Sequence, residues 1–172
     1  FEELMIYTIF SVDQMGGFGN KGSLPWAHDP EDMEWFREHT LGHTVVMGRG
    51  TWDDPKMPKP MPDRENCVIS SSPLHAKHFR VNRFHKNYKE RLVEMSKATP
   101  NKKIFILGGP KLIMDCLDII DWAYITHRKG AGFTDVKLDM TKFMATMMFR
   151  SCRPSKSGML NFCTYKNIDP FR

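Results

Sequence analysis

One carboxylate lies where an amphipathic helix should be apolar. The segment Pro30–Thr40 has helical periodicity, with Asp29 as a good N-cap and a proline at the first helical position. In helical projection, Asp32 falls between Trp35 and Phe36 in the middle of the apolar arc. Burying a carboxylate without a partner is costly, so such a residue usually marks a ligand contact or a site of proton transfer.

A structural role for the same residue is the alternative. Asp32 stands at the third helical position, where a carboxylate can support the cap through backbone N–H groups. Geometry alone leaves both interpretations of Asp32 open.

Two further segments combine an apolar strand, glycine and the start of a helix. They are Thr44–Trp52, with Arg49 beside the glycines, and Ile104–Leu112, with Lys111. Ligands of open α/β sheets bind at such carboxyl ends of strands, and helix N-termini offer N–H groups to phosphates. Glycine could serve only backbone freedom here. Two junctions that each carry a cation nevertheless favour a phosphorylated cofactor.

A third glycine-rich segment imitates a dinucleotide fingerprint. Gly17–Gly22 matches the pattern G-x-G-x-x-G, which requires a helix opening at the glycines. Pro25 follows shortly and pushes Leu24 away from helical geometry, so we reject that motif. The segment is better interpreted as a mobile loop that could act as a lid.

Composition limits the class of protein. The chain has 172 residues, 41% of them hydrophobic and 26% charged, which is enough for one domain with a real core. We see neither a transmembrane run nor a signal peptide. Met5 is a candidate for the natural start, in which case residues 1–4 would not be native, and the sequence leaves both interpretations open. The four cysteines form no Cys-x-x-Cys and are expected to be free buried thiols in a reducing cytoplasm. The histidine pairs are not accompanied by the Cys, Asp or Glu ligands of a metal site, so we expect no metal.

The order of elements predicts an α/β fold. Strand-like runs are expected at Met5–Val12, Thr44–Met47, Cys67–Ser70, Lys103–Leu107, Tyr124–His127 and Phe162–Lys166, with a weaker one at Phe79–Phe84. Helices are expected at Pro30–Thr40, Tyr88–Ala98 and Pro110–Ile119. Alternation of this kind predicts a mostly parallel sheet. Met147–Lys166 instead reads as two strands joined by a turn at residues 153–158, an antiparallel C-terminal edge.

At this point the residues resemble the dihydrofolate reductase family. The blocks occur in the family's order and at nearly its spacing, from about Met5 to Leu138. They are Gly19–Trp26, Asp32–Phe36, Val46–Trp52, Pro60–Arg64, Ile69–Ser71, Leu107–Gly109 and Tyr124–His127. The resemblance implies a single domain with an eight-stranded, mostly parallel sheet and about four helices. It also implies reduction of 7,8-dihydrofolate to 5,6,7,8-tetrahydrofolate by hydride transfer from NADPH, in support of one-carbon metabolism and nucleotide synthesis.

The resemblance also implies roles for individual residues. Asp32 would be the acid of the pterin site, Thr126 the hydroxyl that links it to the pterin, and Trp26 the aromatic that holds a water nearby. Matching positions for folate binding are Ile9, Met33, Phe36, Met57, Met61 and Arg64, of which Arg64 would grip the α-carboxylate of the glutamyl tail.

The NADPH side is matched by a larger set. Arg49, Ser70 and Ser71 correspond to the groups around the 2′-phosphate, and Gly108 and Gly109, joined in the family by a cis peptide bond, to pyrophosphate contacts. The remaining matches are Gly19, Leu24, Gly48, Gly50, Thr51, Ile69, Pro110, Lys111 and Leu112.

Some residues depart from the family's pattern, and two rival functions follow from other uses of the fold. Gly50 stands where a second polar residue is common, Asp63 replaces a glycine before Arg64, and Pro110 follows the glycine pair. One rival is a reductase of a pyrimidine intermediate in riboflavin synthesis; the other is a non-catalytic nucleotide-binding module.

The net charge of +5 suits two anionic ligands. We expect a cytoplasmic monomer that binds dihydrofolate and antifolate-like molecules, but neither nucleic acid nor membrane.

Overall fold

The computed structural model describes residues 3–18, 29–130 and 136–168. Eight strands form one sheet in the order β4-β3-β2-β5-β1-β6-β8-β7. Their bounds are β1 Ile6–Val12, β2 Thr44–Gly48, β3 Glu65–Ile69, β4 Asn82–Phe84, β5 Ile104–Gly108, β6 Trp122–Arg128, β7 Met147–Pro154 and β8 Leu160–Asn167. Pairing is parallel from β4 to β6, and β8 runs antiparallel to both β6 and β7. The expected fold class, with its antiparallel C-terminal edge, is confirmed.

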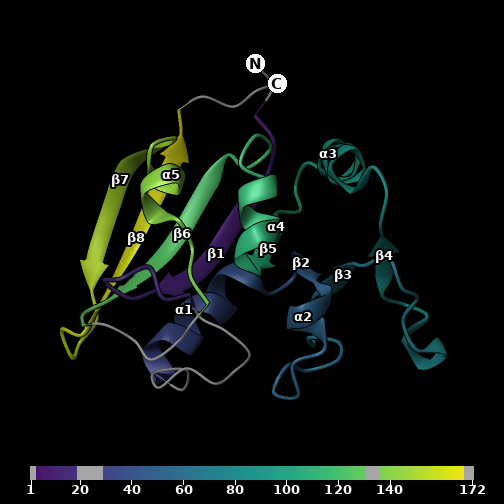
Figure 1. Ribbon diagram of the computed structural model, residues 1–172, viewed down its shortest axis with the longest axis horizontal. Coiled ribbons are helices and arrows are strands. Elements are labelled where there is room, and N and C mark those ends of the chain that lie inside the picture. The colour runs from purple at the N-terminus through teal and green to yellow at the C-terminus, as the bar shows by residue number, and fades with distance from the viewer. Residues whose placement is uncertain (1–2, 19–28, 131–135, 169–172) are drawn as a thin grey trace.

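The helices lie on both faces of this sheet. They are α1 Pro30–Thr40, α2 Arg49–Trp52, α3 Tyr88–Ala98, α4 Pro110–Asp115 and α5 Met140–Met144, with a 3₁₀ turn at Ala76–His78. Figure 1 shows α4 and α5 in front of the sheet and α1 behind it. Two short helices of the described residues were not predicted by periodicity, because four or five residues are too few to show a period: α2, which the glycine junction indicated, and α5, which nothing in the sequence indicated.

Two buried clusters correspond to the two faces. One gathers residues of β1, α3, α4 and α5, among them Phe10, Leu92, Ile113 and Phe143. The other joins alternate residues of the same strands to α1 and α2 and includes Tyr7, Ile9, Trp35 and Trp52. Because successive side chains of a strand point to opposite faces, β1 feeds both clusters. The α1 face carries Asp32 and the residues expected to bind folate.

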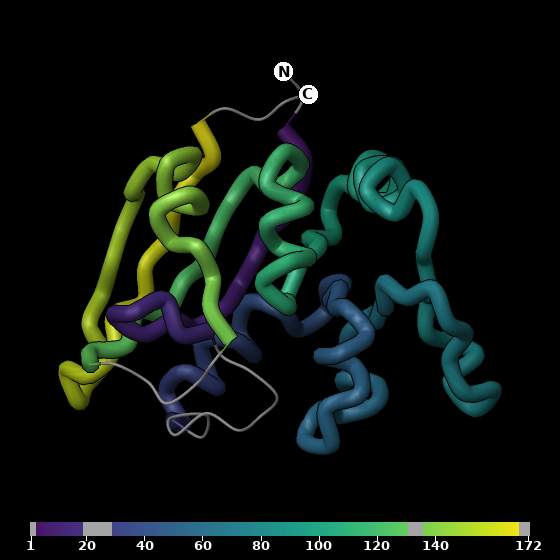
Figure 2. Tube along the Cα trace, in the orientation of Figure 1, coloured from purple at the N-terminus to yellow at the C-terminus, as the bar shows by residue number. Residues whose placement is uncertain are grey.

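The segment after β1 is tied to the segment before α5. Phe18 forms an isolated bridge with Val12, and Gly17 forms one with Lys137. Phe18 N–H donates to the Val136 carbonyl at 2.8 Å. In the tube view these two stretches, far apart in sequence, lie side by side near the lower ends of the strands (Figure 2).

The cysteines only partly follow the sequence-based expectation. Cys67 and Cys116 are free and buried, and burial raises the pKa of each thiol to about 12. Cys152 and Cys163 instead form a disulfide between β7 and β8, so the expectation of free thiols is wrong for this pair. The register of the hairpin places these two residues directly opposite one another, which their spacing along the chain does not reveal.

Candidate active site

Helix α1 brings Asp32 to the carboxyl ends of the central strands. The Asp29 side chain caps the helix by accepting hydrogen bonds from the backbone N–H groups of Glu31 and Asp32. Asp32 is therefore not needed as the cap, which removes the structural alternative raised by the sequence. Trp35, one turn later, is buried and stacks on Phe162 of β8 with ring centroids 5.0 Å apart, which fixes the helix against the sheet.

The Asp32 carboxylate is held by two hydroxyl groups. Thr126 Oγ1 on β6 donates to Oδ1 at 2.7 Å, and Ser11 Oγ on β1 donates to Oδ2 at 2.8 Å. Burial raises the pKa of Asp32 above its usual range, while the two hydroxyl hydrogen bonds oppose that rise. A carboxylate has about four acceptor positions, so acceptor capacity remains for a ligand.

The residues expected to line the folate site occupy the same face. Ile9 is buried in the α1-side cluster, and Phe36, Met57 and Met61 are partly buried against it. Met33 is an exception, since its residue is 56% exposed and its side chain lies outside this cluster. The apolar arc inferred for the helix is therefore narrower than periodicity suggested.

Arg64 lies at the far end of α1 from Asp32. Its Nε donates to the Pro62 carbonyl at 2.8 Å, its Nη1 donates to Thr40 Oγ1 at 3.1 Å, and its guanidinium carbon is 6.0 Å from the Phe36 ring centroid. Asp63 has φ 60°, the left-handed conformation that the family's glycine would adopt easily. The substitution at 63 therefore preserves a glycine-like turn in front of Arg64.

The two glycine junctions meet between β2 and β5. A Cβ on Gly48 would lie 3.7 Å from the Gly108 carbonyl oxygen. The Gly108–Gly109 peptide bond is cis, as the resemblance implied. Gly108 has φ +146°, and a Cβ there would lie 3.0 Å from the Phe18 ring, so glycine is required at this position. Gly48 and Gly109 are the N-caps of α2 and α4, and neither cap makes a side-chain hydrogen bond.

Arg49 and Ser70 form the polar part of the expected NADPH site. Arg49 Nη1 donates to Ser70 Oγ at 3.3 Å, while its Nε pairs with Asp53 Oδ2 at 3.0 Å. Ser70 follows β3 directly, and Ser71 is exposed beside it. The structure therefore places the carboxyl ends of β2, β3 and β5 next to one another, at the same end of these parallel strands. The other matches lie on or beside those elements: Gly50 and Thr51 on α2, Ile69 on β3, and Pro110, Lys111 and Leu112 on α4.

Three expected site residues, Gly19, Leu24 and Trp26, lie outside the described residues, as does most of the predicted lid.

Ser11 is a residue that the sequence analysis missed. It is two positions from Ile9 on β1, so both side chains face α1, and its hydroxyl contacts the carboxylate. A small hydroxyl side chain near the carboxyl end of a buried strand was the available signal. The pairing of β1 with β6, which sets Ser11 opposite Thr126, was needed to interpret it.

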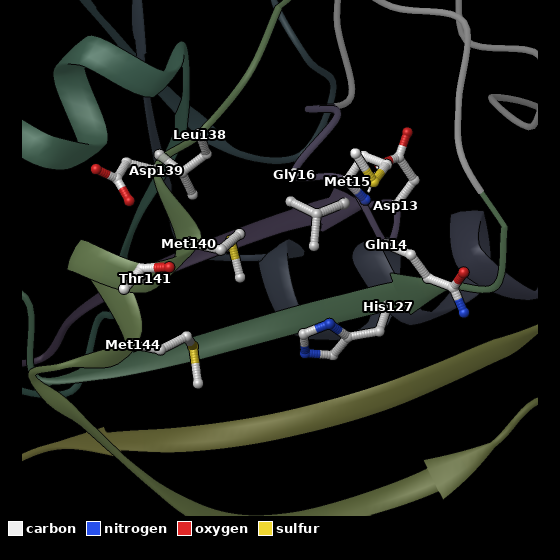
Figure 3. Close-up of a pocket in the computed structure, with 11 residues that line it drawn as sticks. Asp13, Gln14, Met15, Gly16, His127, Leu138, Asp139, Met140, Thr141 and Met144 are labelled. Carbon is white, nitrogen blue, oxygen red and sulfur yellow. Dashed lines mark hydrogen bonds between the residues drawn. The ribbon is translucent and has the colours of Figure 1, made fainter.

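A separate cavity lies on the opposite side of β1. Its volume is about 570 Å³, and it is lined by the turn after β1, by β6 and by α5. Figure 3 shows Asp13, His127, Met140 and Met144 around it. None of the residues expected to bind substrate or cofactor lines this cavity. Among the described residues there is no group of three metal-ligating side chains, and no helix is long and apolar enough to cross a bilayer.

The fold and the site together define an α/β enzyme with a carboxylate beside the central strands and a phosphate-compatible edge next to it. A model of the dihydrofolate reductase family matches residues 5–156. The dihydrofolate reductase of Buchnera aphidicola subsp. Schizaphis graminum is 29% identical over 164 residues, which cover 93% of this chain and 96% of that protein. That of Bacillus subtilis is 32% identical over 130 residues, which cover 74% and 73%. The chain belongs to the dihydrofolate reductase family.

A solved structure confirms the fold. The chain is similar to a dihydrofolate reductase from Enterococcus faecalis that was solved in complex with NADP(H) and RAB-propyl. The TM-score is 0.77 at 24% identity, and the match covers 96% of this chain and 97% of that one. Family membership makes the chain an oxidoreductase that reduces dihydrofolate with NADPH, which confirms the enzyme class expected from the sequence.

Proposed function

We propose that Asp32 is the acid group at which this chain reduces 7,8-dihydrofolate to 5,6,7,8-tetrahydrofolate. The observation that carries the proposal is the carboxylate held by Ser11 and Thr126 at the carboxyl ends of β1 and β6. Each hydroxyl donates one hydrogen bond to Asp32. The remaining acceptor positions of the carboxylate can accept hydrogen bonds from a ring N–H and the 2-amino group of a pterin. Paired donors of this kind are what an ionised carboxylate binds best.

The pterin and its tail would extend along α1. Ile9 and Phe36 offer apolar contacts near Asp32, and Met57 and Met61 continue the apolar surface. Arg64 makes two hydrogen bonds within the protein, which leaves other guanidinium N–H groups for the α-carboxylate of the tail. Met33, being exposed, would contact the substrate from its outer side.

The chemistry of the edge formed by β2, β3 and β5 fits NADPH. The N-termini of α2 and α4 have no side-chain caps, so their free N–H groups can donate hydrogen bonds to pyrophosphate oxygens. Arg49 and Ser70 would hold the 2′-phosphate, with Ser71 beside them and with Asp53 released from Arg49 in exchange. NADPH, when bound, supplies the hydride that adds to C6 of the pterin.

The protein's own part in the reaction is to make protonation at N5 easier. An ionised Asp32 against the pterin stabilises positive charge on the ring and so raises its affinity for a proton, directly or through a water molecule. Thr126 fixes one carboxylate oxygen and thereby the orientation of the pair. Trp26 is proposed to hold that water.

We also propose that the chain is a single domain that works as a cytoplasmic monomer, without nucleic acid or membrane partners. The support is that the named site residues of the described part come from one continuous sheet, its helices and the segments that connect them. Size-exclusion chromatography with light scattering should give a mass near 20.0 kDa.

The direct test follows NADPH oxidation by its near-ultraviolet absorbance after dihydrofolate is added. We expect rapid oxidation by the unmodified chain and its loss in Asp32→Asn. In Arg64→Leu we expect the KM for dihydrofolate to rise about tenfold, the effect of losing one charge-assisted hydrogen bond. Arg80→Leu is the matched control, because Arg80 is exposed and stacks on Phe79, away from the proposed site residues on α1. Full activity of Asp32→Asn at neutral pH would overturn the assignment.

A further inference from the structure

Two hydroxyl groups at the same level of neighbouring strands enclose the Asp32 carboxylate. Ser11 on β1 is the register partner of Thr126 on β6, and both side chains lie on the α1 face. One oxygen of Asp32 accepts from each hydroxyl, at 2.8 Å from Ser11 and 2.7 Å from Thr126. Because Ser11 and Thr126 stand on paired backbone and Asp32 is fixed by a capped helix, the three groups form a rigid arrangement.

This arrangement restricts rotation of the carboxylate. The terminal torsion of an aspartate is soft, with a broad distribution of angles. A single hydrogen bond leaves the other oxygen free to swing, whereas two donors on separate strands fix the plane of the group. A pterin that presents two N–H donors needs that plane to be fixed, because both bonds must form together.

The hydroxyls also act on ionisation. A hydroxyl that donates to a carboxylate favours the charged form, which opposes the cost of burial. Among the described residues, the charged groups that act on Asp32 are Asp29, the N-cap of α1, which raises its pKa, and Arg128 at the end of β6, which lowers it. Strand β1 contains no charged residue. The Ser11 hydroxyl is therefore the group of this strand that stabilises the ionised form of Asp32.

We propose that Ser11 is a second positioning residue for the catalytic carboxylate, equal in kind to Thr126, which orients Asp32 and keeps it ionised for the pterin. The inference rests on the proposed role of Asp32 and adds a residue to it. Ser11 is not placed in contact with the reacting atoms, and it acts through Asp32.

The first test observes Asp32 without any turnover. The carboxyl carbon of Asp32, labelled with ¹³C and assigned by its disappearance in Asp32→Asn, is titrated by NMR in the substrate-free protein. In Ser11→Ala we expect the titration to move to higher pH than in the unmodified chain, because a hydrogen bond to the charged form is lost. Ser11→Thr, which retains the hydroxyl, should titrate close to the unmodified chain.

Thr8→Val is the matched control. Thr8 lies on the same strand and is buried, but its hydroxyl donates to the Ile106 carbonyl at 2.8 Å and does not contact Asp32. Its removal costs a hydrogen bond of β1 without touching the carboxylate. We therefore expect Thr8→Val to leave the Asp32 titration and the KM for dihydrofolate unchanged.

The second test is kinetic. We expect kcat/KM for dihydrofolate to fall about tenfold in Ser11→Ala, mainly through KM, and to recover in Ser11→Thr. An Asp32 titration in Ser11→Ala identical to that of the unmodified chain would overturn the inference, and so would a shifted titration with unchanged kcat/KM. Loss of activity in Asp32→Asn alongside either result would leave the proposed function intact. Full activity in Asp32→Asn would instead refute the proposed function, whatever Ser11→Ala does.

Discussion

Two carboxylates lie at the carboxyl end of β1, and their hydrogen-bond partners differ in kind. Asp13 comes directly after the strand, is 5% exposed, and its Oδ1 accepts from the backbone N–H groups of Met15 and Gly17, each at 2.8 Å. Asp32 is half-buried and comes from a separate helix, and its carboxylate accepts from the side-chain hydroxyls of Ser11 and Thr126.

The difference teaches how burial of a charge should be interpreted. The bonds of Asp13 close a turn in which its own N–H also donates to the Gly17 carbonyl at 3.0 Å, so this carboxylate replaces backbone partners that the turn would otherwise lack. The bonds of Asp32 satisfy no backbone group. In the role we propose, they hold the carboxylate in place for the pterin, and burial alone does not distinguish this role from that of Asp13.

The largest expected effect separates the two acids by activity. Replacing Asp32 with alanine should lower kcat/KM for dihydrofolate about 10²- to 10⁴-fold, the range for loss of a group that assists proton transfer. Asp13→Ala should keep kcat/KM within about tenfold, because Asp13 lines the separate cavity beside α5 and its Oδ1 accepts from the backbone of the turn at Met15 and Gly17. Steady-state kinetics at a temperature where both variants are folded makes the comparison. Equal losses in both would show that the two acids do not have separate roles.

The second effect separates them by stability. Asp13→Ala leaves two N–H groups of a tight turn without their acceptor, which should cost about 2 kcal/mol of unfolding free energy. Urea denaturation measures it, and Ser151→Ala, which removes one half of an exposed hydroxyl pair between β7 and β8, gives the baseline of a mild substitution. A loss no larger than that of Ser151→Ala would refute the structural role of Asp13.

A third, smaller effect tests the packing around Asp13. A Cβ on Gly17 would collide with the Asp13 carboxylate, although the backbone of Gly17 suits other residues. Gly17→Ala should therefore destabilise the chain, and Asp13→Ala should relieve part of that loss, with a coupling of about 1 kcal/mol in the double-mutant cycle. Strictly additive effects would mean that the collision is not what requires glycine at this position.

The smallest effect concerns the pH dependence of stability. Burial raises the pKa of Asp32 above the usual carboxyl value of 3.8, so the folded chain holds this proton more tightly than the unfolded chain. Its ionisation therefore costs stability as pH rises from 3.8 through the folded pKa, and Asp32→Asn avoids that cost. The asparagine variant should gain unfolding free energy relative to the unmodified chain as pH rises through this range, and lose the advantage in acid. Denaturation curves across pH check it, and an advantage that shrank as pH rose would contradict the direction of the shift.

The sequence predicted those parts that depend on one element at a time. The inward-facing Asp32 was found because helical periodicity and the Asp29 cap are local properties. The two C-terminal antiparallel strands, β7 and β8, were found because a turn separates them. Ser11 was missed because its meaning depends on the pairing of β1 with β6. The disulfide was missed for the same reason, since the register of β7 and β8 decides it.

Asp13 and Met33 show two further limits of sequence analysis. Asp13 stands at the start of a glycine-rich stretch, where an acid suggests a solvated loop, and only the folded turn shows what it binds. Met33 falls at the edge of the apolar arc of α1, and the sheet covers less of that arc than a helical projection allows.

The most direct measurement of the central claim is the rate of hydride transfer in a single turnover of NADPH-loaded Asp32→Asn with dihydrofolate, followed as pH is lowered. Because the variant has lost the carboxylate that assists protonation, we predict a rate at least about 100-fold below that of the unmodified chain at neutral pH. That rate should rise steadily toward acid as solvent protons reach the ring unaided. A variant that transferred hydride at the unmodified rate at neutral pH would contradict the account.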